Sequence, residues 1–336
     1  MSGNLRVGVI GMGVGLRHAE AYGNDPRCEV TMLCDSSEPA LEKAGCIFPD
    51  AMKVREADKI IADPSIDIVS IASFDEYHFS QTRDALNAGK HVFVEKPICR
   101  SEEELVQLRS AWMKHAGRLK LGCNFVLRGA PLYQWLKEKI STGAFGRIYS
   151  IDAEYLYGRL HKIVEGWRSE TREYSVMQGG GIHMMDLLLW LTGERPVDVV
   201  AAGNRICTEN TAFRYNDFAT SIMTYSSGMI TRLTANFGCV HRHQHVLRIY
   251  GTKATFIYDD CGARLHTSRD PETDPEFVGL DALPPDKGVL IPRFISAVDK
   301  DEDITSDFAM ICDGLRVCLA CDRAAETNQK ERIKYK

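Results

Sequence analysis

Several features are missing from this 336-residue sequence, and each absence narrows the range of functions. No stretch approaches the roughly 20 consecutive apolar residues that a membrane-spanning helix needs. There is no basic stripe and the formal net charge is −5, so nucleic-acid binding gains no electrostatic support. No export signal precedes the first strand-like segment, which begins at Leu5. We therefore expect a cytoplasmic protein that binds neither membranes nor nucleic acids.

Disulfides and metal sites also lack support. The 11 cysteines follow no framework spacing, as is typical of reduced thiols in a cytoplasm. Cys318 and Cys321 form a C-x-x-C inside an apolar helical pattern, with no second pair of ligands nearby, so we interpret them as small apolar residues on a buried helix face. His241, His243 and His245 alternate as on one face of a strand, which we interpret as solvated or at an interface. We expect no metal.

The composition that is present is that of a globular protein with two domains. Hydrophobic residues make up 44% and charged residues 26%, and 336 residues exceed one ordinary core. In the first part of the chain, short apolar runs alternate with helical patterns such as Lys53–Ile61 and Ser101–Met113, the latter with Ser101 as its N-cap and Glu104 as capping-box partner. This alternation predicts βαβ units and a doubly wound parallel sheet of the Rossmann type over residues 1–123.

From Asn124 onward the pattern changes. Strand-like runs follow one another with short turns between them, which indicates a large, mostly antiparallel sheet in an α+β domain over residues 124–336. The polar stretch Gly262–Pro292 is interpreted as a loop, and a final helix follows it. Alternation within Ser221–Phe237 offers an apolar sheet face that needs to be covered. We expect a homodimer or homotetramer that forms through this sheet.

A glycine cluster directly follows the first strand and precedes a helix: Gly11, Met12, Gly13, Val14 and Gly15. Glycine there allows a tight turn and lets a pyrophosphate approach main-chain N–H groups at a helix N-terminus. The next strand ends at Asp35, 20 residues after Gly15, where a carboxylate can accept from a ribose 2′-hydroxyl and would repel a 2′-phosphate. The sequence therefore predicts a site for NAD rather than NADP, although the third glycine comes one residue earlier than in G-x-G-x-x-G.

A more specific signal is Glu95-Lys96-Pro97 at the end of a parallel strand, where open α/β sheets place ligands. Together with the glycine cluster, Ser73 leading to His78, the Gly122-Cys-Asn124 junction, Trp167-Arg168 and the run Gly179-Gly-Gly-Ile-His183-Met-Met-Asp186, it resembles the Gfo/Idh/MocA oxidoreductase family over nearly the whole chain. The resemblance implies that Ser73, His78, Glu95, Lys96 and Asn124 join the glycines and Asp35 in holding NAD. It also implies a cis Lys96–Pro97 bond, with Lys96 beside the nicotinamide and the substrate hydroxyl.

The predicted chemistry is hydride transfer from a secondary hydroxyl. Lys96 would stabilise the developing alkoxide, and His183 would accept the hydroxyl proton, while Asp186 lies on the same helix face as His183. Many family members carry an Asp four residues before this histidine, but here the position is Gly179. Either His183 works with Lys96 alone, or a tyrosine such as Tyr157 or Tyr174 supplies the missing polar group.

Polar and aromatic side chains at the start of the second half, by the same resemblance, help to line the substrate pocket: Arg128, Tyr157, Arg159, His161, Trp167 and Arg168. Arg and Trp suit sugar phosphates and nucleotide sugars. We expect an NAD-dependent enzyme that oxidises or reduces a hydroxyl on a sugar, cyclitol or nucleotide sugar, with Arg128, Tyr157, Trp167, Arg168 and Asp186 binding the substrate. Two alternatives remain open: transient oxidation by tightly bound NAD for epimerisation or elimination, and an NAD-binding sensor without turnover.

Overall fold

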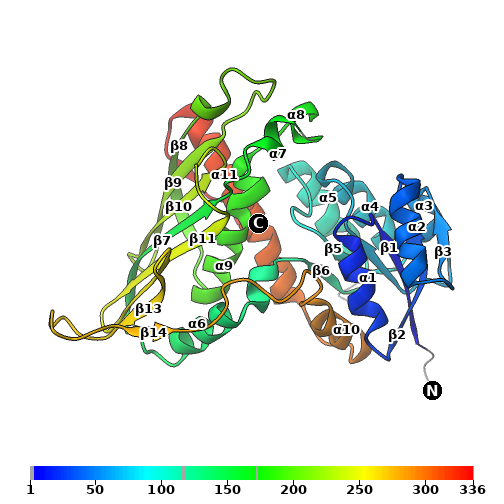
Figure 1. Ribbon diagram of the computed structural model, residues 1–336, viewed down its shortest axis with the longest axis horizontal. Coiled ribbons are helices and arrows are strands. Elements are labelled where there is room, and N and C mark those ends of the chain that lie inside the picture. The colour runs from blue at the N-terminus through cyan, green and yellow to red at the C-terminus, as the bar shows by residue number, and fades with distance from the viewer. Residues whose placement is uncertain (1–3, 116–117, 166, 172, 336) are drawn as a thin grey trace. The chain divides into compact units, whose positions relative to one another are not determined.

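A computed structural model describes residues 4–115, 118–165, 167–171 and 173–335, without the side chains of Trp167 and Glu170. The chain forms two compact units (Figure 1). The first consists of Met1–Gly129 and Pro284–Cys312, and the second of Ala130–Leu283 and Asp313–Lys336. The segment Pro284–Cys312 thus joins the first unit, whereas the sequence-based division at residue 124 had assigned it to the second.

The first unit is built on a six-stranded parallel sheet in the order β3-β2-β1-β4-β5-β6. Its strands are β1 (Leu5–Ile10), β2 (Cys28–Cys34), β3 (Met52–Val54), β4 (Ile68–Ile71), β5 (His91–Val94) and β6 (Leu121–Cys123). The sheet order reverses between β1 and β4, the two strands that start the two halves of a doubly wound sheet. This arrangement confirms the predicted Rossmann fold class.

Helices cover this sheet, because its strands are buried over most of their length and need apolar cover on both faces. They are α1 (Gly15–Gly23), α2 (Glu38–Ile47), α3 (Ala57–Ile61), α4 (Asp75–Asn87), α5 (Glu102–Met113) and α10 (Ile291–Asp299). At the start of α5 the Ser101 hydroxyl accepts from the Glu104 N–H at 3.2 Å, which confirms the predicted N-cap. α10 lies beside α1 (Figure 1). The ring centroid of its Phe294 lies 5.3 Å from that of Phe93 of β5, in the same core.

The second unit is built on a nine-stranded sheet in the order β14-β13-β12-β11-β7-β10-β9-β8-β15. The strands are β7 (Ile148–Leu156), β8 (Pro196–Asn204), β9 (Phe218–Tyr225), β10 (Ile230–Asn236), β11 (Gln244–Gly251), β12 (Thr255–Asp259), β13 (Gly262–His266), β14 (Glu276–Val278) and β15 (Glu331–Arg332). β7 and β10 pair in parallel, and the other neighbours pair antiparallel. The mostly antiparallel α+β fold predicted from the sequence is confirmed.

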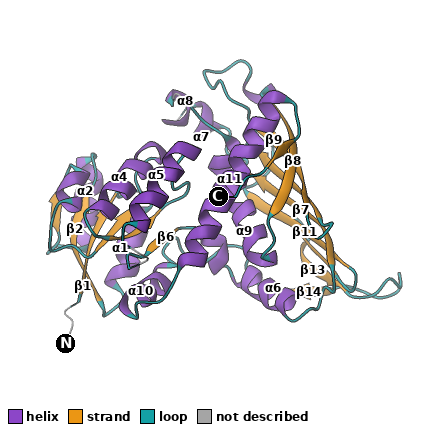
Figure 2. Ribbon diagram, turned by 180° about the vertical axis from the view of Figure 1, so that it is seen from behind, coloured by secondary structure: helices purple, strands orange, loops and turns teal. Residues whose placement is uncertain are grey.

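One face of the large sheet is covered by α6 (Pro131–Ser141), α9 (Ile182–Thr192) and α11 (Thr305–Thr327), as Figure 2 shows. Cys318 and Cys321 are buried on α11, in agreement with their interpretation as packing residues. The other face exposes apolar side chains, among them Val200, Ile222 and Ile230. No helix in the described part of the chain is long and apolar enough to cross a membrane.

Two sequence expectations about local structure were wrong. Gly262–Pro292 is not all loop, since it contains β13 and β14 and the beginning of α10. The helical pattern predicted over Lys53–Ile61 includes the end of strand β3, and only Ala57–Ile61 is helical. The three misassigned strands are short and lie near or at a sheet edge, where few residues alternate and turn residues flank the pattern.

Candidate cofactor and active site

The glycine cluster forms the turn between β1 and α1. Gly11 has φ +87°, and a Cβ there would meet the backbone of Ala72, which follows β4. At Gly13, by contrast, no heavy atom of the described chain other than those of Gly13 and its two chain neighbours lies within 4 Å of the Cβ position. Gly15 is the first residue of α1, and a Cβ there would touch Val9 and Ala72 at 3.2 Å. The first and third glycines thus allow close packing, and the middle one leaves open space for a ligand.

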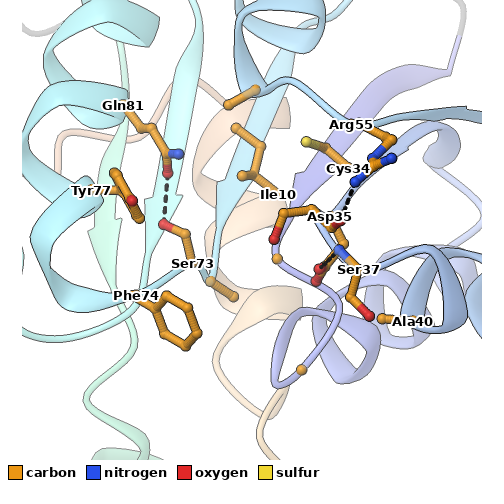
Figure 3. Close-up of a pocket in the computed structure, with 15 residues that line it drawn as sticks. Ile10, Cys34, Asp35, Ser37, Ala40, Arg55, Ser73, Phe74, Tyr77 and Gln81 are labelled. Atoms are coloured by element: carbon orange, nitrogen blue, oxygen red, sulfur yellow. Dashed lines mark hydrogen bonds between the residues drawn. The ribbon is translucent and has the colours of Figure 1, made fainter. Parts of the chain in front are cut away.

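Asp35 lies where β2 ends and is bound to the glycine turn. Its Oδ2 accepts from the Met12 N–H at 2.6 Å. Its Oδ1 accepts from the Ser37 N–H at 2.8 Å (Figure 3). The carboxylate is therefore held beside the turn by two backbone donors. This is the location at which the sequence predicted contact with a ribose hydroxyl.

A cavity of about 490 Å³ opens beside these residues. It is lined by segments that follow the carboxyl ends of four parallel strands and includes Gly11, Gly13, Asp35 and Ser73 (Figure 3). Among the lining residues that were not singled out from the sequence, four have large polar or aromatic side chains: Arg55, Phe74, Tyr77 and Gln81. Each follows the end of β3 or β4, so the rule that ligands bind at this edge of the sheet provides a signal for them. The residues present fit a dinucleotide.

Two of these residues are already oriented by hydrogen bonds. Ser73 donates its hydroxyl proton to Gln81 Oε1 at 2.7 Å, and the Arg55 guanidinium donates to the Ser36 carbonyl at 2.9 Å. His78 is buried, with Nδ1 2.7 Å from the Pro97 carbonyl and Nε2 3.1 Å from the Ser73 carbonyl. His78 therefore holds the segment after β4 against the segment after β5, rather than facing the open cavity, which it does not line.

Glu95 and Lys96 follow β5 directly. Asn124 donates from Nδ2 to Glu95 Oε1 at 2.7 Å, and His18 Nε2 lies 3.3 Å from the same oxygen. Burial by itself raises the pKa of Glu95. The hydrogen bond and charge of His18, the Asn124 hydrogen bond and the Lys96 charge outweigh this effect, so the pKa falls from its ordinary value to about 2. Glu95 is therefore an anion beside the half-buried Lys96, and the Lys96–Pro97 bond is cis, as predicted. His18, on α1, was not anticipated.

In the second unit His183 is the second residue of α9, just after the π-helical turn η2 (Met177–Gly181). Its ring stacks on Tyr155 of β7, with centroids 5.8 Å apart and 11° between the planes. Asp186 is buried three residues further along the helix. The imidazole is thus held against an aromatic ring, near the beginning of a buried helix.

The glycines of η2 are explained by aromatic neighbours. A Cβ on Gly180 would meet the rings of Tyr155 and Phe237, so glycine lets the helix approach the sheet. A Cβ on Gly179 would meet Tyr174, whose hydroxyl end fills that space. Of the two tyrosines considered from the sequence, Tyr174 is the one that lies at Gly179.

Besides Asp186, three of the predicted substrate-binding residues can be placed. Tyr157 is buried against Phe237 at 4.6 Å, and Arg168 donates from Nε to the Tyr174 hydroxyl at 3.1 Å. Arg128 belongs to the first unit, in the 3-10 turn η1 (Val126–Gly129), where it is 3.7 Å from Asp307. The side chain of Trp167 lies outside the described residues.

The histidine interpretation requires a correction. His245 is not solvated: it is buried in β11, and its ring lies 5.3 Å from Tyr155 and 6.3 Å from His183. His243 packs on the same tyrosine at 5.1 Å, while His241 pairs with Asp260 on the surface. The neighbouring β7 supplies the aromatic partner, which a single strand's pattern does not reveal. In the part of the chain that the structure describes, no three His, Cys, Asp or Glu side chains are grouped to hold a metal ion.

The first unit has the form of an NAD-binding oxidoreductase domain, and comparison with known proteins gives the class and the family. Residues 5–122 match the family described as "Oxidoreductase family, NAD-binding Rossmann fold", and residues 133–257 match the "GFO/IDH/MocA C-terminal domain". The protein is an NAD-dependent oxidoreductase, and it belongs to the Gfo/Idh/MocA family.

Relatives with assigned names are similar over most of the chain. UDP-N-acetylglucosamine 3-dehydrogenase from Acidithiobacillus ferrooxidans is 30% identical over 234 residues, covering 69% of this chain and 67% of that protein. D-glucoside 3-dehydrogenase from Escherichia coli is 27% identical over 286 residues, covering 79% and 78%. A solved structure of levoglucosan dehydrogenase in complex with NADH has a TM-score of 0.87 at 20% identity, covering 99% of this chain and 100% of that one, which shows the shared fold.

Proposed function

We propose that this enzyme oxidises, or in the reverse direction reduces, a secondary hydroxyl of a sugar, cyclitol or nucleotide sugar. The observation that carries the proposal is Glu95-Lys96-Pro97 at the carboxyl end of β5, on the sheet edge that also bears the glycine turn and Asp35. The names of the relatives, which are sugar dehydrogenases, support a carbohydrate substrate.

In the proposed mechanism NAD, when bound, accepts or returns the hydride. The glycine turn, with its open space at Gly13, and Asp35 would hold the dinucleotide. The Lys96 ammonium stabilises the oxygen of the substrate as it becomes an alkoxide. The neighbouring Glu95 carboxylate is a fixed anion that attracts the positive charge of this ammonium. His183 accepts the hydroxyl proton on its imidazole and returns it in the reverse reaction.

The test combines a substrate screen with variants. Wild-type enzyme is incubated with NAD and a panel of sugars, inositols and nucleotide sugars, and NADH absorbance is followed. On the best substrate, Lys96→Ala should lower kcat by ~10²–10³-fold, the usual loss for one electrostatic group at a developing oxyanion, with NAD affinity largely retained. His183→Ala should lower kcat and remove the acidic limb of the pH profile.

Lys43→Ala, at an exposed position of α2, and His115→Ala serve as controls that should keep wild-type rates. A Lys96→Ala enzyme with unchanged kcat would contradict the mechanism. Wild-type protein that binds NAD yet converts nothing in a broad panel would favour a sensor instead.

A further inference from the structure

The place of the family's acidic residue is filled by another side chain. At Gly179, four residues before His183, the Tyr174 Cζ lies 2.8 Å and its Cε1 3.5 Å from where a Cβ would be, with the hydroxyl closer still. Both residues belong to the second unit, and Gly179 is buried. A carboxylate has therefore been exchanged for a phenol that enters the same space from the preceding segment of chain.

The Tyr174 phenol is hydrogen-bonded to a cationic side chain. Arg168 donates from Nε to the Tyr174 oxygen at 3.1 Å, and its guanidinium carbon lies 5.9 Å from the centre of the Tyr174 ring. Where a typical relative has a negatively charged acceptor, this chain has a neutral hydroxyl next to a fixed positive charge. The local charge at the Gly179 space is therefore positive in this chain, where an Asp would make it negative.

This position lies beside His183. Residues four apart share a helix face, so the Gly179 space and the imidazole are neighbours. Tyr155 interacts with both: its ring stacks on His183 with centroids 5.8 Å apart, and Tyr174 and Arg168 both act on the pKa of its phenol. The pKa of Tyr155 is raised chiefly by burial, then by Tyr157 and Tyr174, and is lowered by the charge of Arg168.

A second guanidinium borders the same aromatic cluster. The exposed Arg159 lies 5.7 Å from the ring centre of Tyr157, which stacks on Tyr155 at 6.0 Å. The charge of Arg159 also lowers the pKa of Tyr155. The cluster also contains the buried acid Asp186, three residues after His183 along α9.

We propose that Tyr174, held by Arg168, binds substrate in place of the family's acidic residue and selects a sugar or cyclitol that carries an anionic group near the reacting hydroxyl. A carboxylate or phosphate accepts from a phenol and gains from the adjacent guanidinium charges, whereas a carboxylate side chain in the same place would repel it. This inference rests on the proposed function for the reaction, and it adds the class of substrate.

The experiment compares matched pairs: glucuronate with glucose, and glucose 6-phosphate with glucose. Wild-type kcat/KM should be higher for an anionic member, and the two arms distinguish a carboxylate from a phosphate. Tyr174→Phe, which removes only the hydroxyl, and Arg168→Gln should each reduce that preference roughly 10- to 100-fold, as expected for a lost hydrogen bond to a charged group. The loss should appear mainly in KM, with NAD affinity unchanged.

A reversal variant provides a second test. In Gly179→Asp combined with Tyr174→Ala, the acid returns and the ring that would collide with it is gone, so the preference should move to the neutral sugars. Tyr149→Phe and Arg269→Gln, both exposed, are matched controls that should retain the wild-type preference. Thermal melting of every variant separates altered specificity from failed folding.

Calorimetric binding of the same sugars to the NAD-loaded Lys96→Ala enzyme separates this inference from the proposed reaction. A preference for anionic ligands in binding without any turnover in the wild-type enzyme would retain the inference and overturn the reaction. A wild-type preference for the neutral members, or a Tyr174→Phe enzyme that treats anionic and neutral substrates as the wild type does, would overturn the inference.

Discussion

Asp322 offers a prediction that needs no substrate. It lies half-buried on α11, where Oδ1 accepts from the Ser175 hydroxyl at 2.7 Å and Oδ2 accepts from Gln178 Nε2 at 3.0 Å. Ser175 also accepts from the Gln178 N–H at 3.1 Å, so this carboxyl group secures the turn that leads into η2 and His183. Burial raises the pKa of Asp322 to about 6, although both side-chain hydrogen bonds lower it.

The size of the effect follows from the pKa difference. The ordinary Asp value is 3.8, and a rise of about two units corresponds to roughly 3 kcal/mol. Because the folded state binds the proton more tightly than the unfolded state, this contribution to stability is present below about pH 4. It is lost as the pH rises through about 6. Asp322→Asn keeps an oxygen acceptor but cannot ionise.

The free energy of unfolding of the Asn variant, measured relative to wild type, should therefore increase by about 3 kcal/mol between pH 4 and pH 7. The assay is urea unfolding at several pH values, followed by tryptophan fluorescence. Asp274→Asn, an exposed carboxyl in the same unit, should show a smaller pH dependence. A difference between wild type and Asp322→Asn that stays constant from pH 4 to pH 7 would refute the reasoning.

Three other predictions concern the cofactor and assembly. Asp35→Ser should narrow the preference for NAD over NADP in binding titrations, and tighter binding of NADP than NAD by the wild type would contradict the role of Asp35. Gly11→Ala should sharply lower NAD affinity or stability, because Gly11 has φ +87° and the added methyl group would meet the Ala72 backbone. A Gly11→Ala protein with the NAD affinity and melting temperature of the wild type would contradict this prediction. Ile222→Lys with Ile230→Lys should dissociate the expected homo-oligomer in sedimentation, and a wild-type monomer at all concentrations would remove the expectation.

Local patterns were enough to predict the parallel sheet of the first unit and the glycine turn between β1 and α1, but not the segment Pro284–Cys312. Hydrophobic runs of strand length, the glycines of the turn and the acid that ends β2 lie close together in the sequence and act through the backbone. The N-cap at Ser101 is equally local. These features depend on backbone conformation and on the burial of neighbouring residues, so a single sequence reveals them without knowledge of distant contacts.

The tertiary structure alone decided which distant side chains meet. It joins Pro284–Cys312 to the first unit, pairs β7 with β10 in parallel, and buries His245 against Tyr155. It also identifies Tyr174, rather than Tyr157, as the side chain that fills the space at Gly179. Such contacts depend on the packing of side chains from separate elements, which no periodicity within one segment encodes. The sequence alone determined that the family's acid is missing, and only the fold determined what occupies its place.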